Sequence, residues 1–207
     1  MANVAAVVLA AGASVRFGPE NKLVARVGGR PLVRCVAEAV AGSGVSEIVA
    51  VTGADAALIE GALEGLPVRF AHNATWQDGM GTSIAAGVSA LGESADGAFI
   101  VPGDMPLLTT DLLQSLIAAF DRHGGGPIVY PATLDGEQRN PVLWPRRFFP
   151  KLRALSGPEG GKALLRTLAV ETVAVPCDPA AFADVDTPAE LRQVAERLDA
   201  AAHKSGT

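Results

Sequence analysis

Short apolar runs bounded by glycine and proline recur along the chain, and segments with helical periodicity separate most of them. The apolar runs predict strands at residues 4–10, 47–52, 67–71, 97–101, 127–131 and 171–176. The periodic segments predict helices at about 31–42, 54–64, 81–90, 109–122, 159–169 and 187–201. Strands that alternate with helices are typical of a parallel sheet with crossover helices.

The segment "TLDGEQRNPVLW" breaks this alternation. Its Asp135-Gly136 pair is a turn signal before an apolar stretch, which predicts a hairpin and one antiparallel strand. We therefore expect a doubly wound α/β fold with a mostly parallel, mixed sheet. The 207 residues show no linker, repeat or low-complexity tract, so we expect one domain over residues 1–207, with a frayed tail from about 201.

Composition and charge exclude several classes of protein. The net charge of -5 and the pI near 5.2 disfavour a nucleic-acid partner, which needs a basic face. The apolar run from Val4 to Ala11 is too short to cross a bilayer, and no Lys or Arg precedes it as in a signal peptide. Cys35 and Cys177 lie far apart and form no metal-binding pattern. We expect a reduced, cytoplasmic protein with no membrane partner.

The first candidate site is the turn within "VVLAAGASVRFGPENK", residues 7–22. The spacing of Gly12 and Gly18 fits neither the Walker pattern nor the dinucleotide-binding pattern. The small residues at 10–14 let backbone N–H groups approach an anion closely, and Arg16 and Lys22 add two positive charges. Such a turn could hold a triphosphate, although an ordinary tight turn with solvated charges explains the same residues.

Two acidic segments are candidate metal ligands. In "IVPGDMPLL", residues 100–108, a buried strand ends and presents Asp104. Magnesium takes one or two carboxylates plus substrate phosphates, so one Asp beside a triphosphate is sufficient, but Asp104 could also be only a turn residue. In "FADVDTPAEL", residues 182–191, Thr187, Pro188 and Glu190 form a capping box. Asp186 is not needed for that box, so it is either a second metal ligand or a partner of the helix dipole.

Two further segments are candidates for substrate contacts. "WQDGMGTSIAAG", residues 76–87, carries the small groups of Gly81, Thr82 and Ser83, which can lie against a base or simply cap a helix. "GEQRNPVLW" offers Arg139 and Asn140 beside a strand. These two residues either contact an acceptor or flank the hairpin.

The order of these segments resembles one family. LAAGASVRFG with Lys22, then GMGTSIAAG, PGDMP, RNPVLW and DVDTP resemble the MobA-like nucleotidyltransferases, most closely the molybdenum cofactor cytidylyltransferase branch, over about residues 4–195. The resemblance implies a Rossmann-like fold of the nucleotide-diphospho-sugar transferase kind that binds an NTP with Mg²⁺. It implies transfer of CMP from CTP to the phosphate of molybdenum-bound molybdopterin, with a molybdenum hydroxylase or its chaperone as a further partner.

The resemblance also implies functions for individual residues. Arg16, Lys22 and Asp104 would be catalytic, and Asp104 and Asp186 would hold Mg²⁺. The residues expected to contact the nucleotide are Leu9, Ala10, Ala11, Gly12, Ala13, Ser14, Arg16, Lys22, Gly79, Gly81, Thr82 and Ser83. The residues expected to contact the acceptor are Arg139, Asn140 and Lys162.

The nucleotide and the acceptor are the points on which alternatives stay open. Guanylyltransferase relatives resemble LAGG at the first turn, whereas Leu9-Ala10-Ala11-Gly12 is similar to the cytidylyl branch and favours CTP. The family's Arg-Gly-His-Pro or Arg-Gly-Asn-Pro reads Gln138-Arg139-Asn140-Pro141 here, and its Gly-Asp-x-Gly-Ala-Arg reads Gly157-Pro158-Glu159-Gly160-Gly161-Lys162. The alternatives are a GTP-dependent guanylyltransferase, a sugar- or polyol-phosphate nucleotidyltransferase, and a non-catalytic carrier of the molybdenum cofactor.

Overall fold

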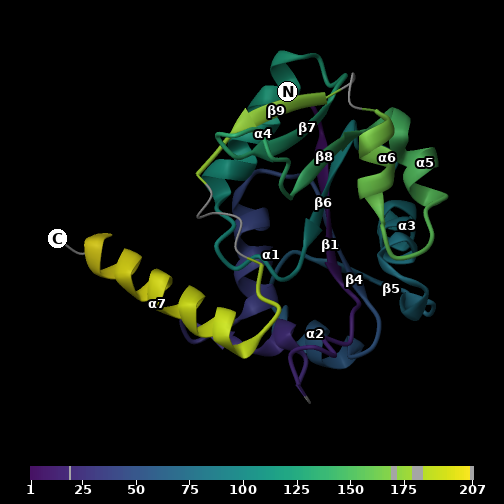
Figure 1. The fold of residues 1–207 in the computed structure, drawn as a ribbon. Coiled ribbons are helices and arrows are strands. Elements are labelled where there is room, and N and C mark those ends of the chain that lie inside the picture. Colours follow the sequence, from purple (N-terminus) through teal and green to yellow (C-terminus); the bar gives the residue numbers. More distant parts are fainter. Residues whose placement is uncertain (19, 169–171, 179–183, 206–207) are drawn as a thin grey trace.

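The computed structural model describes residues 1–18, 20–168, 172–178 and 184–205. These residues form a seven-stranded sheet in the order β5-β4-β1-β6-β8-β7-β9 (Figure 1). The strands are β1 Val4–Ala10, β4 Ile48–Thr52, β5 Arg69–His72, β6 Gly97–Pro102, β7 Ile128–Ala132, β8 Val142–Pro145 and β9 Thr172–Pro176. Strand β8 runs antiparallel to β6 and β7, and the other neighbouring pairs are parallel. The predicted doubly wound, mostly parallel fold and the antiparallel strand are confirmed.

Helices cover both faces of the sheet (Figure 1). They are α1 Leu32–Gly42, α2 Ala56–Ala62, α3 Met80–Ala90, α4 Thr110–Arg122, α5 Phe149–Arg153, α6 Gly161–Thr167 and α7 Pro188–Ser205. All predicted helices are present, but α7 continues to Ser205, past the point where we expected a frayed tail. The sequence did not predict α5, nor the small hairpin of β2 (Arg26–Val27) and β3 (Arg30–Pro31).

The alternation of side chains along the strands divides the core in two. In β1, Val4, Ala6 and Val8 pack with α1, α2 and α4, whereas Ala5 and Val7 pack with α3, α5 and α6. Successive side chains of a strand point to opposite faces, so the unbroken apolar run of β1 is what a strand buried on both faces requires. This explains why the apolar runs located the central strands correctly.

The carboxyl ends of β1 and β6 meet at one edge of the sheet. The strands are parallel neighbours, with Leu9 opposite Pro102, and the Gly103 N–H donates to the Leu9 carbonyl at 3.0 Å. A Cβ at Gly103 would lie 2.7 Å from that carbonyl oxygen, so glycine permits this approach. The turn after β1 and the segment with Asp104 therefore begin side by side, at the edge where open α/β sheets bind ligands.

Chain direction places the remaining candidate segments at the same edge. A short 3₁₀ helix, η1 (Lys22–Val24), follows the first turn, and a second, η2 (Trp76–Asp78), precedes α3. The Val185 N–H donates to the Asp104 carbonyl at 3.1 Å, which brings the segment before α7 to the end of β6. In the described ranges, no helix combines the length and the apolar character that crossing a membrane requires.

Candidate functional site

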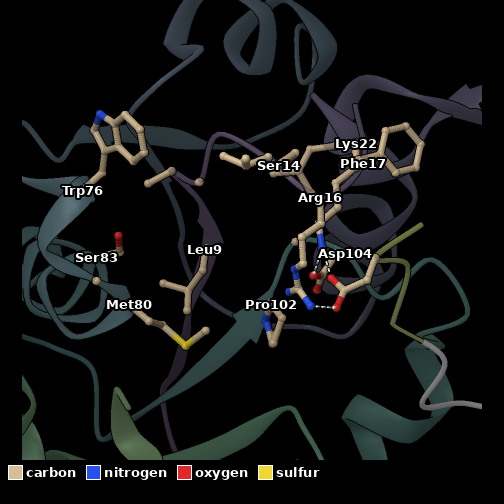
Figure 2. A pocket seen from close by; sticks show the side chains of 17 residues that line it. Leu9, Ser14, Arg16, Phe17, Lys22, Trp76, Met80, Ser83, Pro102 and Asp104 are labelled. Atoms are coloured by element: carbon tan, nitrogen blue, oxygen red, sulfur yellow. Dashed lines mark hydrogen bonds and ion pairs between the residues drawn. The ribbon is translucent and has the colours of Figure 1, made fainter. Parts of the chain in front are cut away.

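A cavity of about 370 Å³ opens at the carboxyl ends of β1 and β6. Trp76, Met80 and Ser83 lie at one end of it, and Arg16 and Asp104 lie at the other (Figure 2). The full lining consists of Leu9, Ala11, Gly12, Ser14, Val15, Arg16, Phe17, Lys22, Leu23, Trp76, Gly79, Met80, Ser83, Pro102, Gly103, Asp104 and Asp186. The cavity therefore has one charged end and one end of apolar and small side chains.

The charged end brings together the four ionic residues that the sequence analysis assigned to phosphate and metal binding. Lys22 Nζ donates to Asp104 Oδ2 at 2.6 Å and to Asp186 Oδ1 at 2.7 Å. Arg16 Nη1 lies 3.0 Å from Asp186 Oδ2 (Figure 2). Two cations and two carboxylates from three distant segments thus form one cluster. Its charges balance without an added ion.

Burial and charge pairing act against each other on Lys22. Desolvation alone would lower the pKa of Lys22, but Asp104 and Asp186 outweigh it and raise this pKa above its ordinary value. The hydrogen bond from Lys22 lowers the pKa of Asp186, against the opposing effect of its own desolvation. Lys22 and Asp186 are therefore both charged at neutral pH.

The donor set at this end fits a hard divalent cation. Asp104 Oδ1 is buried and has no hydrogen-bond partner among the described residues, which is costly for a carboxylate oxygen unless a ligand uses it. Within the same ranges no three His, Cys, Asp or Glu side chains converge on one point. Magnesium needs only one or two carboxylates when substrate phosphates complete its coordination.

The opposite end is built on the start of α3. Gly79, with φ of +112°, and Ser83 line the cavity, and both are among the residues expected to contact the nucleotide. Gly81 and Thr82 are outside the lining: the Gly81 N–H donates to the Gly157 carbonyl at 2.9 Å, and Thr82 Oγ1 donates to the Gly79 carbonyl at 2.9 Å. These two hydrogen bonds hold the beginning of α3 against the segment with Gly157 and against the turn that precedes the helix. Ala10 and Ala13 of the first turn are also outside the lining.

Trp76 is a lining residue that the sequence analysis did not select. A Cβ at Gly53 would lie 2.9 Å from the Cβ atoms of both Ala11 and Trp76, so these segments meet at one wall. Figure 2 shows the indole near Ser83 and across from the ionic cluster. Trp76 is the first residue of the segment at 76–87, and its large aromatic side chain before a Gly-rich turn is the signal in the sequence that could have identified it.

A second cavity, of about 390 Å³, adjoins the first and shares Leu9, Met80 and Pro102 with it. Its further apolar lining is Ile84, Ile100, Met105, Val142, Trp144, Pro158, Gly161 and Leu165, and its polar lining is Gln138, Arg139, Asn140, Glu159, Lys162 and Asp184. All three predicted acceptor residues therefore lie in one place. Arg139 Nε is buried without a hydrogen-bond partner in the described chain, while Nη2 of the same side chain pairs with Glu137 at 2.6 Å.

Asp184 of the second cavity was also missed from the sequence. The residue is exposed as a whole, yet desolvation of its carboxyl group, with the nearby charges of Asp104 and Asp186, raises its pKa to about 6. Lys22 and Arg139 oppose this increase. The Asp-x-Asp pattern of residues 184–186 is the signal that could have identified it.

A family model of the MobA-like NTP transferase domain matches residues 6–173, which is most of the chain. The chain belongs to this family. The predicted resemblance is confirmed, and membership supports an enzyme of the NTP transferase type. The bifunctional protein GlmU of Agrobacterium fabrum is 38% identical over 112 residues, which cover 53% of this chain and 24% of that protein. The match thus spans about a quarter of the length of this relative.

Solved structures show the same fold at low sequence identity. Rv0371c from Mycobacterium tuberculosis has a TM-score of 0.81 at 21% identity, covering 94% of this chain and 98% of that one. A manganese complex of Rv0371c has a TM-score of 0.76 at the same identity and coverage. A CMP:2-keto-3-deoxy-manno-octonic acid synthetase complexed with CTP has a TM-score of 0.72 at 16% identity, covering 95% and 98% of the two chains.

Proposed function

We propose that the protein transfers CMP from CTP to the phosphate of molybdenum-bound molybdopterin, in a reaction that requires Mg²⁺. The observation that carries the proposal is the junction of two cavities at Leu9, Met80 and Pro102. One cavity carries the ionic cluster beside the first turn, and the other gathers the predicted acceptor residues. Two substrates bound in them would meet at the carboxyl ends of β1 and β6.

The first cavity supplies what a triphosphate needs. The turn of residues 10–14 would offer backbone N–H groups, and Arg16 and Lys22 would neutralise phosphate oxygens. Asp104 and Asp186 would hold Mg²⁺, and the unpartnered Asp104 Oδ1 supports this assignment. When bound, the ion supplies charge neutralisation at the phosphates. The manganese complex of Rv0371c is consistent with a divalent cation in this fold.

The second cavity suits an acceptor with a ring and an anionic group. Its apolar floor includes Trp144, and Arg139 and Lys162 place two cations on its polar side. A phosphate monoester is largely ionised at neutral pH, since its second pKa is about 6, so its oxygen can attack the α-phosphorus without a strong general base. A new bond forms between that oxygen and the α-phosphorus as the bond to the bridging α–β oxygen breaks, and pyrophosphate leaves with the electron pair. Alignment and charge neutralisation then provide the catalysis.

The choice of CTP is supported by the wall near Trp76. Ala11 lines the cavity there, and its methyl group would narrow the space for the base in comparison with a glycine at the same position. A narrower site favours a pyrimidine. The similar synthetase that was solved with CTP supports the same choice of nucleotide.

The test combines purified protein and Mg²⁺ with each NTP in turn and either molybdopterin or a panel of sugar and polyol phosphates. We expect pyrophosphate release with CTP and molybdopterin, and a cytosine dinucleotide product identified by its mass. Turnover with GTP instead would identify a guanylyltransferase, and turnover with a sugar phosphate would replace the proposed acceptor. Binding of molybdopterin without pyrophosphate release from any NTP would identify a carrier.

A further inference from the structure

Asn21 precedes Lys22 and is only 5% exposed, although it lines neither cavity. Its Oδ1 accepts hydrogen bonds from Ser14 Oγ at 2.9 Å and from the Leu23 N–H at 3.0 Å. Its Nδ2 donates to the Gly12 carbonyl at 3.0 Å and to Asp55 Oδ2 at 2.8 Å. Both hydrogens and both lone pairs of the amide are therefore used. A buried side chain bonded in this way has one defined orientation.

Asn21 connects the first turn to the helix that carries Lys22. Gly12 and Ser14 belong to the turn, and Asn21 is the N-cap of η1, which begins with Lys22. Ser14 has φ of +53°, a left-handed conformation that is costly for a residue other than glycine. Its hydroxyl bond to Asn21 holds the turn in this conformation, so the turn and Lys22 are fixed relative to one another through a single side chain.

Asn21 also controls two oxygens that would repel a bound anion. The Gly12 carbonyl would oppose phosphate binding if it faced the cavity, and the Asn21 amide engages it instead. Asp55 is the N-cap residue of α2, where its carboxylate makes no capping hydrogen bond among the described residues but accepts one from Asn21. The negative charge of Asp55, which is outside the cavity lining, is thus held by a donor near the turn.

We propose that Asn21 is a positioning residue for the triphosphate: it shapes the turn of residues 12–14, sets the place of Lys22 and engages the oxygens of Gly12 and Asp55. This inference rests on the proposed function, because it assumes that the first cavity binds an NTP. The competing explanation is that Asn21 serves only the stability of the fold. The two explanations differ in whether loss of Asn21 affects the phosphates of a nucleotide more than its nucleoside part.

The experiment measures the affinities of wild type and Asn21→Ala for cytidine and for CTP with Mg²⁺, by NMR titration and calorimetry. Loss of the contacts that shape the turn should weaken CTP binding by about tenfold, the effect of about one net buried hydrogen bond. Cytidine lacks phosphates, so its affinity should not change, and the CTP-to-cytidine affinity ratio should fall by the same factor. A role in folding alone would leave this ratio unchanged.

Ser43→Ala is the matched control. Ser43 is also 5% exposed and donates one buried hydrogen bond, to the Val40 carbonyl at 2.7 Å, at the end of α1. It lines neither of the two cavities. We expect both variants to lower the melting temperature by a few degrees, but only Asn21→Ala to change the affinity ratio.

A second variant covers the case in which Asn21→Ala does not fold. Asn21→Asp combined with Asp55→Asn keeps the net charge and allows a hydrogen bond between the two positions, but it cannot donate to the Gly12 carbonyl. The affinity ratio should fall here too, and a wild-type ratio in a folded variant would overturn the inference. If wild type binds no NTP, the proposed function fails and the inference with it. If wild type binds CTP but the ratio is unchanged, only the inference fails.

Discussion

Asp104 is the side chain on which the proposed metal site depends most directly, and it lines the first cavity. It lies at the tip of β6, holds Lys22 through one carboxylate oxygen and leaves the other without a partner among the described residues. We expect Asp104→Ala to abolish pyrophosphate release while the protein stays folded, because Lys22 keeps Asp186 as a partner. Pyrophosphate release by a coupled assay and melting temperature are the measurements.

The control for Asp104→Ala is Asp111→Ala, which removes the same charge from an exposed position in the first turn of α4. It should keep wild-type turnover. Turnover close to wild type in Asp104→Ala itself would remove Asp104 from the mechanism.

Ala11 provides a test of nucleotide choice at a single methyl group. Ala11→Gly should widen the first cavity near Trp76. We expect it to reduce the preference for CTP over GTP by about tenfold, which is the usual effect of one methyl group in a closely fitting pocket. Ala13→Gly makes the same chemical change in the same turn outside the cavity lining, and it should preserve the preference. The measurement is kcat/KM for CTP and for GTP. The same CTP-to-GTP ratio in wild type and both variants would show that Ala11 does not set the choice of nucleotide.

At the scale of elements, the ionic cluster joins segments that are distant in the sequence. Lys22 of η1 contacts Asp186, just before α7, so the pair helps to attach this helix to the sheet edge. The folded pKa of Asp186 lies below its ordinary value of 3.8. The pair therefore adds stability above this pH, and that stability is lost as the pH falls through the lowered pKa.

We expect Asp186→Asn to reduce the free energy of unfolding at pH 7 by about 1 kcal/mol or less, since the side chain is partly exposed and solvent screens the pair. The difference from wild type should shrink as the pH falls below 3.8 and through the lowered pKa of Asp186. Urea unfolding at pH 7 and at a series of lower pH values provides the measurement, with Glu60→Gln on the exposed side of α2 as the control. A difference that does not decrease with falling pH would contradict this assignment.

The elements show where prediction from the sequence succeeded and where it failed. Strands buried on both faces appear as unbroken apolar runs, so β1, β4 and β6 could be located within a residue. The hairpin of β2 and β3 has only two residues in each strand, too few to give a periodic signal, and α5 is equally short for a helix. Helix α5 begins at Phe149-Pro150, directly after β8 and the short 3₁₀ helix η3 (Arg146–Phe148), and no polar cap marks this boundary.

The sequence predicted the four charged residues of the ionic cluster, but it did not predict Asp184 of the second cavity or the residues that support the cluster. Arg16, Lys22, Asp104 and Asp186 were selected because each follows or precedes a strand or helix end, and the structure gathers them. Asn21 was not selected because its function depends on partners at Gly12 and Asp55, which only the fold brings near. No pattern of residue spacing in the sequence predicts which distant residues such a side chain will contact.

At the scale of the whole molecule, a chain of net charge -5 brings Arg16 and Lys22, the two cations that we propose bind phosphates, together at one edge of its sheet. The two cavities meet at that edge, where they share Leu9, Met80 and Pro102. The net negative charge of the rest of the chain disfavours the binding of long polyanions such as nucleic acids. It does not prevent a nucleotide accompanied by a metal ion from binding at this local site. Two adjoining cavities, of which we propose one for the nucleotide and one for the acceptor, are an arrangement that suits nucleotidyl transfer.

The most direct test is a crystal structure of the protein soaked with CTP and Mg²⁺. The account predicts the triphosphate along residues 10–16, the cytosine beside Ala11 and Trp76, and the ion in contact with Asp104 Oδ1. A well-ordered crystal in which CTP lies elsewhere, with Asp104 still bonded only to Lys22, would contradict it.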